Sequence, residues 1–142
     1  MANVGLHAVS LDQAVSGSLP VNAKGINVTE LASASRTTTQ TGADTTNSNA
    51  RGIHVVLDMT IVGTGSVTLT IQAKDEASGK YYTLLAGAAV TTNSTNIYKV
   101  YPGLTAAANA VASDVLTPTF RILVTANNAN AATYSVGYAL IP

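Results

Sequence analysis

The chain contains neither cysteine nor tryptophan in its 142 residues. Without cysteine, no disulfide and no thiolate metal site can form, so stability has to come from side-chain packing and backbone pairing. The absence of a cysteine pair and of tryptophan also disfavours an antibody-type immunoglobulin domain. The length suits one domain with a hydrophobic core of its own.

Charge is scarce as well. Charged residues make up 10% of the chain, against about 25% in an average soluble domain, and the seven basic and seven acidic residues cancel. Such a balance offers no electrostatic footprint for a phosphate backbone or an anionic lipid surface. We therefore expect no nucleic-acid partner and no membrane partner. The start of the chain lacks a basic segment followed by an apolar run, which favours a soluble protein made in a cytoplasm.

Groups suited to catalysis are few. His7 and His54 are the only histidines, and neither has a second ligand at a spacing that would hold zinc. His54 could pair with Asp58 on the same face of a strand, but solvated side chains are the simpler interpretation. The acidic residues fall mostly in expected turns and offer no pair suited to glycoside hydrolysis, and no nucleophile-elbow or phosphate-loop motif is present. The sequence predicts no enzyme and no cofactor.

The chain is rich in alternating apolar and polar residues, the period of a half-buried strand. One face of residues 53–62 carries Ile53, Val55, Leu57, Met59 and Ile61, and one face of residues 67–74 carries Val67, Leu69, Ile71 and Ala73. Gly63-Thr64-Gly65 between the two stretches provides a permissive backbone. We expect these two strands to form a hairpin.

The densest group of charges lies between two such stretches. Lys74, Asp75, Glu76 and Lys80 fall within seven residues, next to Ser78 and Gly79. Asp, Ser and Gly are turn-forming residues, and carboxylates at a mobile hairpin end lack the burial or fixed partner that would shift their pKa values. This cluster is expected to be a solvated hairpin tip and not a catalytic site.

The remaining segments complete an all-β pattern. Further strands are expected near residues 81–86, 95–101, 119–126 and 132–141, and one more within residues 26–39. Residues 102–116 are expected to form a long loop with one short helix, residues 37–52 an exposed loop, and residues 1–25 an extended N-terminal arm before a single domain at 26–142. Seven or eight strands predict an antiparallel β-sandwich of jelly-roll-like type, with an immunoglobulin-like sandwich or a closed barrel as alternatives.

Six tyrosines could stack on sugars or bases. They are Tyr81, Tyr82, Tyr98, Tyr101, Tyr134 and Tyr138. At least half of them alternate onto faces that also carry valine and leucine, which is typical of core or interface aromatics. A carbohydrate-binding module therefore remains only a minor alternative.

Four stretches, "RGIHVVLD", "LTIQAKDEASGKYYTLL", "YPGL" and "FRILVTANNANAATYSVGYALI", resemble small all-β structural proteins encoded with the head genes of tailed bacteriophages. The resemblance covers Arg51 to Ile141, and its motifs are structural: the strand start at Arg51-Gly52, the Lys74 to Tyr82 hairpin and the Tyr101 to Leu104 corner. It implies a virion protein, above all a decoration or cement protein on the capsid exterior. It brings no catalytic residues.

This resemblance implies a homotrimer that binds the major capsid protein after synthesis in the host bacterial cytoplasm. A tail, neck or fibre-associated domain of the virion is the main alternative. The N-terminal arm lies outside the resemblance, and we expect Val4, Leu6, Val9 and Leu11 in it to contribute to the capsid or subunit contact.

Overall fold

The computed structural model describes residues 26–142, which form an all-β fold of ten strands. The strands are β1 (Ile26–Arg36), β2 (Gln40–Thr41), β3 (Thr45–Thr46), β4 (Gly52–Ile61), β5 (Val67–Lys74), β6 (Tyr81–Ala86), β7 (Ser94–Val100), β8 (Val111–Ala112), β9 (Thr119–Ala126) and β10 (Ala132–Ile141). Every strand that the sequence predicts is present, with bounds close to those expected.

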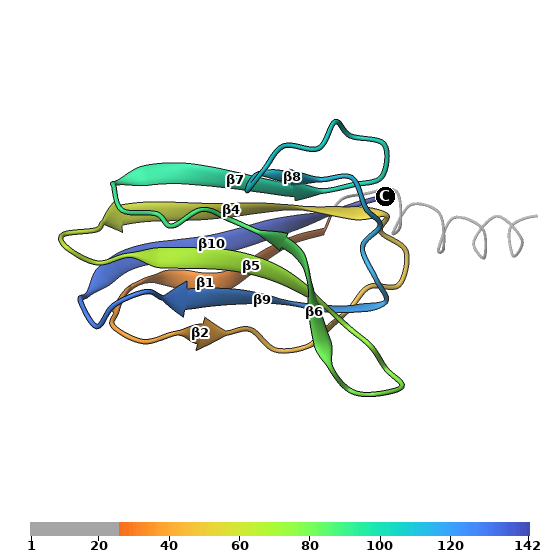
Figure 1. Cartoon of the computed structure of the whole chain (residues 1–142), viewed down its shortest axis with the longest axis horizontal. Coiled ribbons are helices and arrows are strands. Elements are labelled where there is room, and N and C mark those ends of the chain that lie inside the picture. The colour runs from red at the N-terminus through yellow and green to blue at the C-terminus, as the bar shows by residue number, and fades with distance from the viewer. Residues whose placement is uncertain (1–25) are drawn as a thin grey trace, which may run out of the picture.

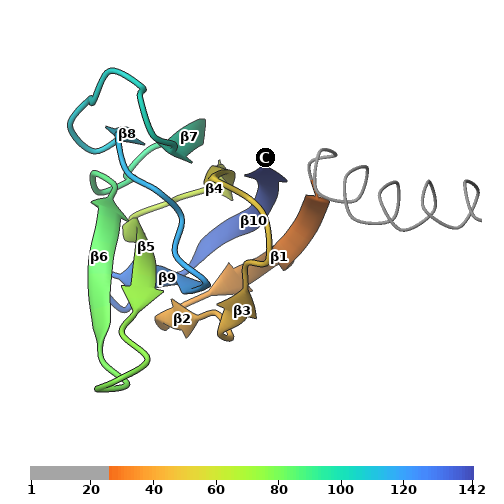
Figure 2. The same ribbon diagram turned by 90° about the vertical axis from the view of Figure 1, so that its right-hand side faces the viewer.

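Two sheets divide the strands between them (Figures 1 and 2). The first, which we call sheet A, has the order β1-β10-β4-β7-β8; the second, sheet B, has the order β2-β9-β5-β6, with β3 also paired to β9. Neighbouring strands are antiparallel except β7 and β8, which are parallel. The structure is thus an antiparallel two-sheet assembly with one short parallel addition at an edge.

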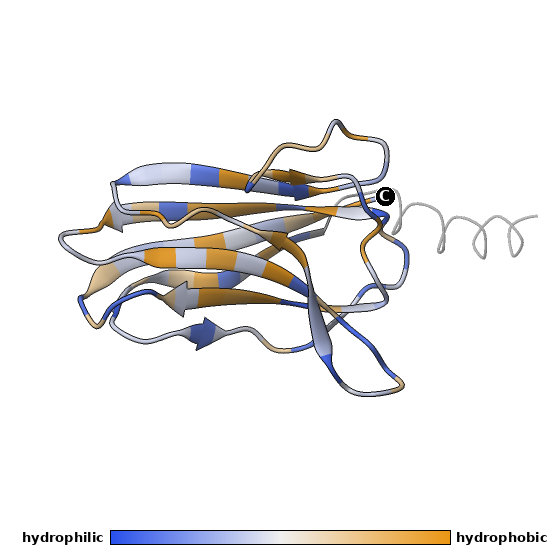
Figure 3. Ribbon diagram, in the orientation of Figure 1, coloured by the Kyte–Doolittle hydropathy of each residue, from blue (hydrophilic) through white to orange (hydrophobic). Residues whose placement is uncertain are grey.

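The hydrophobic core lies between the two sheets. Apolar and polar residues alternate along the central strands (Figure 3), and the predicted inward residues of β5, Val67, Leu69, Ile71 and Ala73, are all buried. Along β4 the prediction holds from Ile53 to Met59, whereas Ile61 at the strand end is exposed. Phe120 of sheet B meets Tyr138 of sheet A edge to face, with 5.8 Å between ring centroids. The buried residues of both sheets form one cluster.

The predicted hairpin between β4 and β5 is wrong. β4 pairs with β10 and β7 in sheet A, whereas β5 pairs with β9 and β6 in sheet B. The connection is a turn, closed by a 2.7 Å hydrogen bond from Gly65 N to Val62 O and permitted by the positive φ of 52° at Gly63. Because both strands place their apolar faces on the same core, the chain crosses from one sheet to the other.

The predicted helix within residues 102–116 is also wrong. The segment consists of turns, with positive φ at Gly103 and Asn109, followed by β8. Two of its backbone carbonyls accept hydrogen bonds from β7 and the residue after it: Lys99 N donates to Ala110 O at 2.9 Å, and Tyr101 N donates to Ala112 O at 3.1 Å. Strand pairing therefore takes the backbone groups that a helix would need.

Residues 37–52 are more ordered than the exposed loop that their polar composition predicts. β2 and β3 lie within them and pair with β9, and Gly42 N donates to Ile122 O at 2.8 Å. Asn47 is buried and ties this segment to residues 116–118, through its side chain to Leu116 O and through its backbone amide to Pro118 O at 2.7 Å. Polar side chains here satisfy backbone groups inside the protein as well as contacting water.

Candidate functional site

The predicted contact residues Val4, Leu6, Val9 and Leu11 lie outside the described residues, as does the whole predicted arm at 1–25. The capsid contact therefore remains a prediction. Within residues 26–142, sheet B carries a polar network and the outer face of sheet A carries an apolar trough.

Residues 75–80 form the exposed turn that the sequence predicts, but Asp75 has fixed partners there, contrary to the expectation that its pKa is unshifted. Asp75 accepts hydrogen bonds from Ser78 Oγ at 2.5 Å and from the amide of Ala77 at 3.2 Å. The Ser78 bond is the main reason that the pKa of the Asp75 carboxyl lies below its usual value. Gly79, with φ of 70°, closes the turn through its amide to Asp75 O at 2.7 Å. The carboxylate of Asp75 therefore organises the turn.

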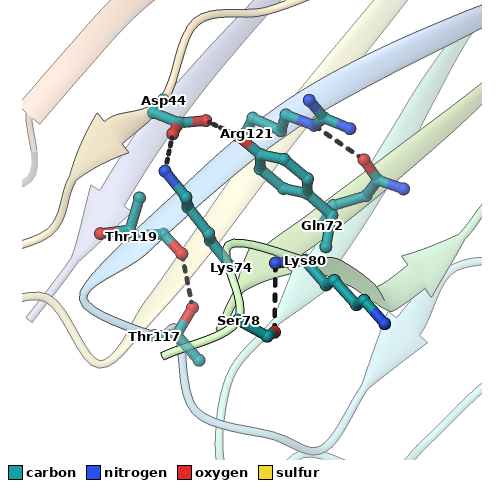
Figure 4. A network of polar contacts seen from close by, with 9 residues as sticks. Asp44, Gln72, Lys74, Ser78, Lys80, Thr117, Thr119 and Arg121 are labelled. Carbon is teal, nitrogen blue, oxygen red and sulfur yellow. Dashed lines mark hydrogen bonds and ion pairs between the residues drawn. The ribbon is translucent and has the colours of Figure 1, made fainter. Parts of the chain in front are cut away.

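Lys74 belongs to a different group, which we call the Asp44 network (Figure 4). The Asp44 carboxylate accepts from Lys74 Nζ at 2.8 Å and from the Tyr81 hydroxyl at 2.6 Å. The Arg121 guanidinium carbon lies 3.3 Å from the centroid of the Tyr81 ring, and Arg121 Nε donates to Gln72 Oε1 at 2.8 Å. Strands β5, β6 and β9 and the β2–β3 connection all contribute to this network.

Electrostatics within the Asp44 network favour the ionised carboxylate. The hydrogen bond from Lys74 is the main cause that lowers the pKa of Asp44, and the same bond raises the pKa of Lys74. The hydrogen bond to Asp44 raises the pKa of the Tyr81 hydroxyl. An ion pair this close to solvent is screened by water and adds little to stability. The network fastens the β2–β3 connection to sheet B, because Lys74 and Tyr81 both donate to Asp44.

His54 and Asp58 do not form the pair that an enzyme would need. Four residues along one strand separate their Cα atoms by about 13 Å. The Asp58 carboxylate instead accepts from Thr95 Oγ1 at 2.8 Å. His54 Nε2 is buried and, among residues 26–142, is one of two buried side-chain atoms without a hydrogen-bond partner.

His54 should make the stability of the protein depend on pH. Burial, followed by the charge of Lys99, lowers the pKa of the imidazole below 6.5. The unfolded chain therefore takes up this proton first as the pH falls, so stability should decline from about pH 6.5 through the lower folded pKa. His54→Gln should remove this part of the dependence. Chemical denaturation at pH 7.5, 6.0 and 5.0 measures it, with His7→Gln as the matched control; identical slopes for the His54 variant and the parent would contradict the assignment.

The outer face of sheet A carries an apolar trough beside His54. Two adjoining hollows of about 350 and 310 Å³ share this residue. Their linings come from β1, β10, β4 and β7 and from the loop after β7, and include Asn27, Gly137, Ala139, Lys99, Tyr101 and Leu104. Asn27, Ala139, His54 and Lys99 stand in one row across the four strands. Small side chains at 137 and 139 leave the floor low between taller neighbours.

Three of the six tyrosines, Tyr98, Tyr134 and Tyr138, are buried, as core aromatics should be. The Tyr101 hydroxyl donates to Pro142 O at 2.9 Å, and Arg121 covers one face of the Tyr81 ring. Tyr82 on β6 is 48% exposed. The structure does not bring these rings together as a stacking platform within residues 26–142.

No group of three or more His, Asp or Glu side chains that could hold a metal ion occurs within residues 26–142. Over the same range, no helix has the length and apolar character needed to traverse a bilayer.

Comparison with known proteins finds a similar fold but identifies no family. No protein-family model matches the chain, and no curated protein matches its sequence. Among solved structures, the SPBc2 prophage-derived protein YomS is similar, with a TM-score of 0.50 and 12% sequence identity over 82% of this chain and 93% of that one. At this level of identity, the similarity establishes a shared fold.

Proposed function

We propose that this chain is a structural protein of a tailed-bacteriophage virion, which decorates the capsid exterior and stabilises it as a homotrimer bound to the major capsid protein. It is made in the host bacterial cytoplasm and has no catalytic activity. The observation that carries the proposal is the fold shared with a prophage-derived protein across 82% of the chain. The sequence resemblance to phage head proteins supports the same origin.

The order of the long strands supports a jelly-roll class for the sandwich. Count β2 and β3 as one strand, leave out β8, and number the remaining eight strands from 1 to 8 along the chain. Sheet A (β1-β10-β4-β7) then has the order 1-8-3-6, and sheet B (β2-β9-β5-β6) has the order 2-7-4-5. This is the order of two interlocked Greek keys. Jelly rolls are common in viral capsid proteins, and they also occur in lectins and cupins.

The surface chemistry suits a building block. Charges are few, and the residues of the Asp44 network bind one another. Close subunit contacts therefore bury few unpaired ions. If three copies meet at a capsid three-fold axis, modest contacts from each arm multiply through their effective concentration.

Two measurements on the full chain test the proposal. Light scattering on a sizing column should give three times the 14.4 kDa chain mass, and co-sedimentation with undecorated heads should recover the protein with the heads. Replacement of Val4, Leu6, Val9 and Leu11 by serine should abolish co-sedimentation, because it removes the apolar side chains assigned to the contact. The matched control, Ala2→Ser with Ala14→Ser in the same arm, should bind like the parent.

Other outcomes would redirect the assignment. A six-fold ring that does not bind heads would favour a neck or tail component. Retained binding by the four-serine variant would remove the arm from the contact. A monomer that binds glycans and not heads would favour a carbohydrate-binding module.

A further inference from the structure

The trough on sheet A opens beside the point where residues 1–25 join the fold. β1 begins at Ile26, and Asn27 is both its second residue and part of the trough lining. From there the row continues through Ala139 and His54 to Lys99. A chain that arrives at Ile26 from the direction of Leu104 would therefore lie across the trough.

The length of the preceding segment fits this path. Three strand spacings of about 4.8 Å separate β1 from β7, so the row is about 14 Å wide. Residues 19–25 span about 23 Å when extended at about 3.3 Å per residue. Seven residues are therefore sufficient to cross the row and reach the wall formed by Tyr101 and Leu104.

The composition of the segment also matches the trough. Leu19, Val21 and Ala23 alternate with Pro20 and Asn22, so an extended chain would present the three apolar side chains on one face. Residues 17–23 carry no charge. Lys24 and Gly25 follow at the junction, where glycine permits the change of direction into β1.

Exposed apolar side chains on this face would gain from such a cover. Leu104 on the wall is 39% exposed, and Val56, which lines the trough two residues after His54, is partly exposed. Burial of such apolar surface is favourable because it removes the surface from water. A segment tethered directly beside the trough has a higher effective concentration there than a separate molecule.

We propose that residues 17–25 of the same chain bind across the sheet A trough, with Leu19, Val21 and Ala23 facing its floor and wall. The preceding residues, with Val4, Leu6, Val9 and Leu11, extend beyond the trough. The trough is thus an intramolecular docking site that sets the direction in which the distal arm leaves the sandwich. This inference concerns the free protein and does not depend on capsid binding.

Disulfide trapping in the full chain tests the inference, since the chain has no cysteine of its own. Leu104→Cys is combined in turn with Leu19→Cys, Val21→Cys and Ala23→Cys, so that one pair can meet the Cα separation of about 4.4–6.8 Å that a disulfide requires. The control combines the same arm cysteines with Ser48→Cys, an exposed position four residues before β4. Oxidation is followed on non-reducing gels and by peptide mass spectrometry.

The expected result is an intramolecular disulfide with position 104 that forms at least about tenfold faster than any with position 48, through the higher local concentration at the trough. Ala139→Glu, which places a carboxylate on the floor, should abolish this difference. Equal rates at positions 104 and 48 would overturn the proposal. If the disulfides between the arm and position 104 form mainly between two molecules, the proposal is overturned, and the arm of one copy binds the trough of another. If Leu104→Cys alone forms covalent dimers, the proposal is overturned, and a second copy of the chain covers the trough.

Discussion

Replacement of Phe120 by alanine is expected to lower the free energy of unfolding by about 3–5 kcal/mol. The Phe120 side chain is 0% exposed and belongs to the buried cluster that joins the two sheets. Its ring meets Tyr138 at 83° between ring planes, so the substitution removes an aromatic contact across the core as well as buried surface. A cavity between two hydrogen-bonded sheets can collapse only partially, which places the cost in the upper range for a core substitution.

Urea denaturation followed by circular dichroism measures this loss. Phe120→Leu should cost about 1–2 kcal/mol, because leucine keeps much of the buried volume. Tyr82→Ala should cost less than about 1 kcal/mol, because that aromatic side chain is 48% exposed on β6. Equal losses for Phe120→Ala and Tyr82→Ala would contradict the central place of Phe120 in the core.

The strands could be predicted from the sequence because burial on one face imposes a period of two. Val67, Leu69, Ile71 and Ala73 illustrate this, since each is buried in β5. The same pattern does not say which strand lies beside which. Alternation in β4 and β5 is satisfied equally by a hairpin and by a crossing between sheets, so the pairing of β4 with β10 and β7 could not be derived from it.

Segments with weak patterns were harder to predict. Residues 102–116 carry alanines at helical spacing, but the backbone groups of Ala110 and Ala112 pair with β7. Helix propensity differs by less than about 1 kcal/mol per residue among ordinary residues, and tertiary pairing overrides it. The short strands β2 and β3 are stabilised by β9, which lies some 80 residues further along the chain.

Both candidate surfaces depend on neighbours that are distant in sequence. Asp44 meets Lys74 and Tyr81 only because β3 and the β5–β6 hairpin flank β9 in sheet B. Likewise, the trough combines His54 with Ala139 and Lys99 from adjacent strands. The sequence showed that His54 and Asp58 share a face; the spacing along a strand explains why they do not meet.

Replacement of Asn47 by alanine should lower the free energy of unfolding by about 2–4 kcal/mol. The local sequence gives no sign of this structural role. The Asn47 side chain is 9% exposed, within a polar stretch that resembles an unstructured loop. Asn47 Nδ2 donates to Ala50 O at 2.8 Å and to Leu116 O at 3.0 Å, and Asn47 Oδ1 accepts from Ala50 N at 2.8 Å. Alanine would leave these buried or partly buried groups without their partner, which costs more than the loss of exposed hydrogen bonds.

The matched control for this substitution is Asn128→Ala. Asn128 makes bonds of the same kind, from its Nδ2 to Thr64 O at 3.0 Å and from Asn130 N to its Oδ1 at 3.1 Å, but on an exposed turn. Water can replace those bonds, so the control should cost less than about 1 kcal/mol. Hydrogen exchange should also show faster opening at Leu116, whose amide donates to Arg51 O at 2.9 Å beside the lost contacts. Asn47 connects the residues before β4 with the residues before β9. Equal losses of stability in the two asparagine variants would contradict the claim that burial makes the Asn47 hydrogen bonds more important than those of Asn128.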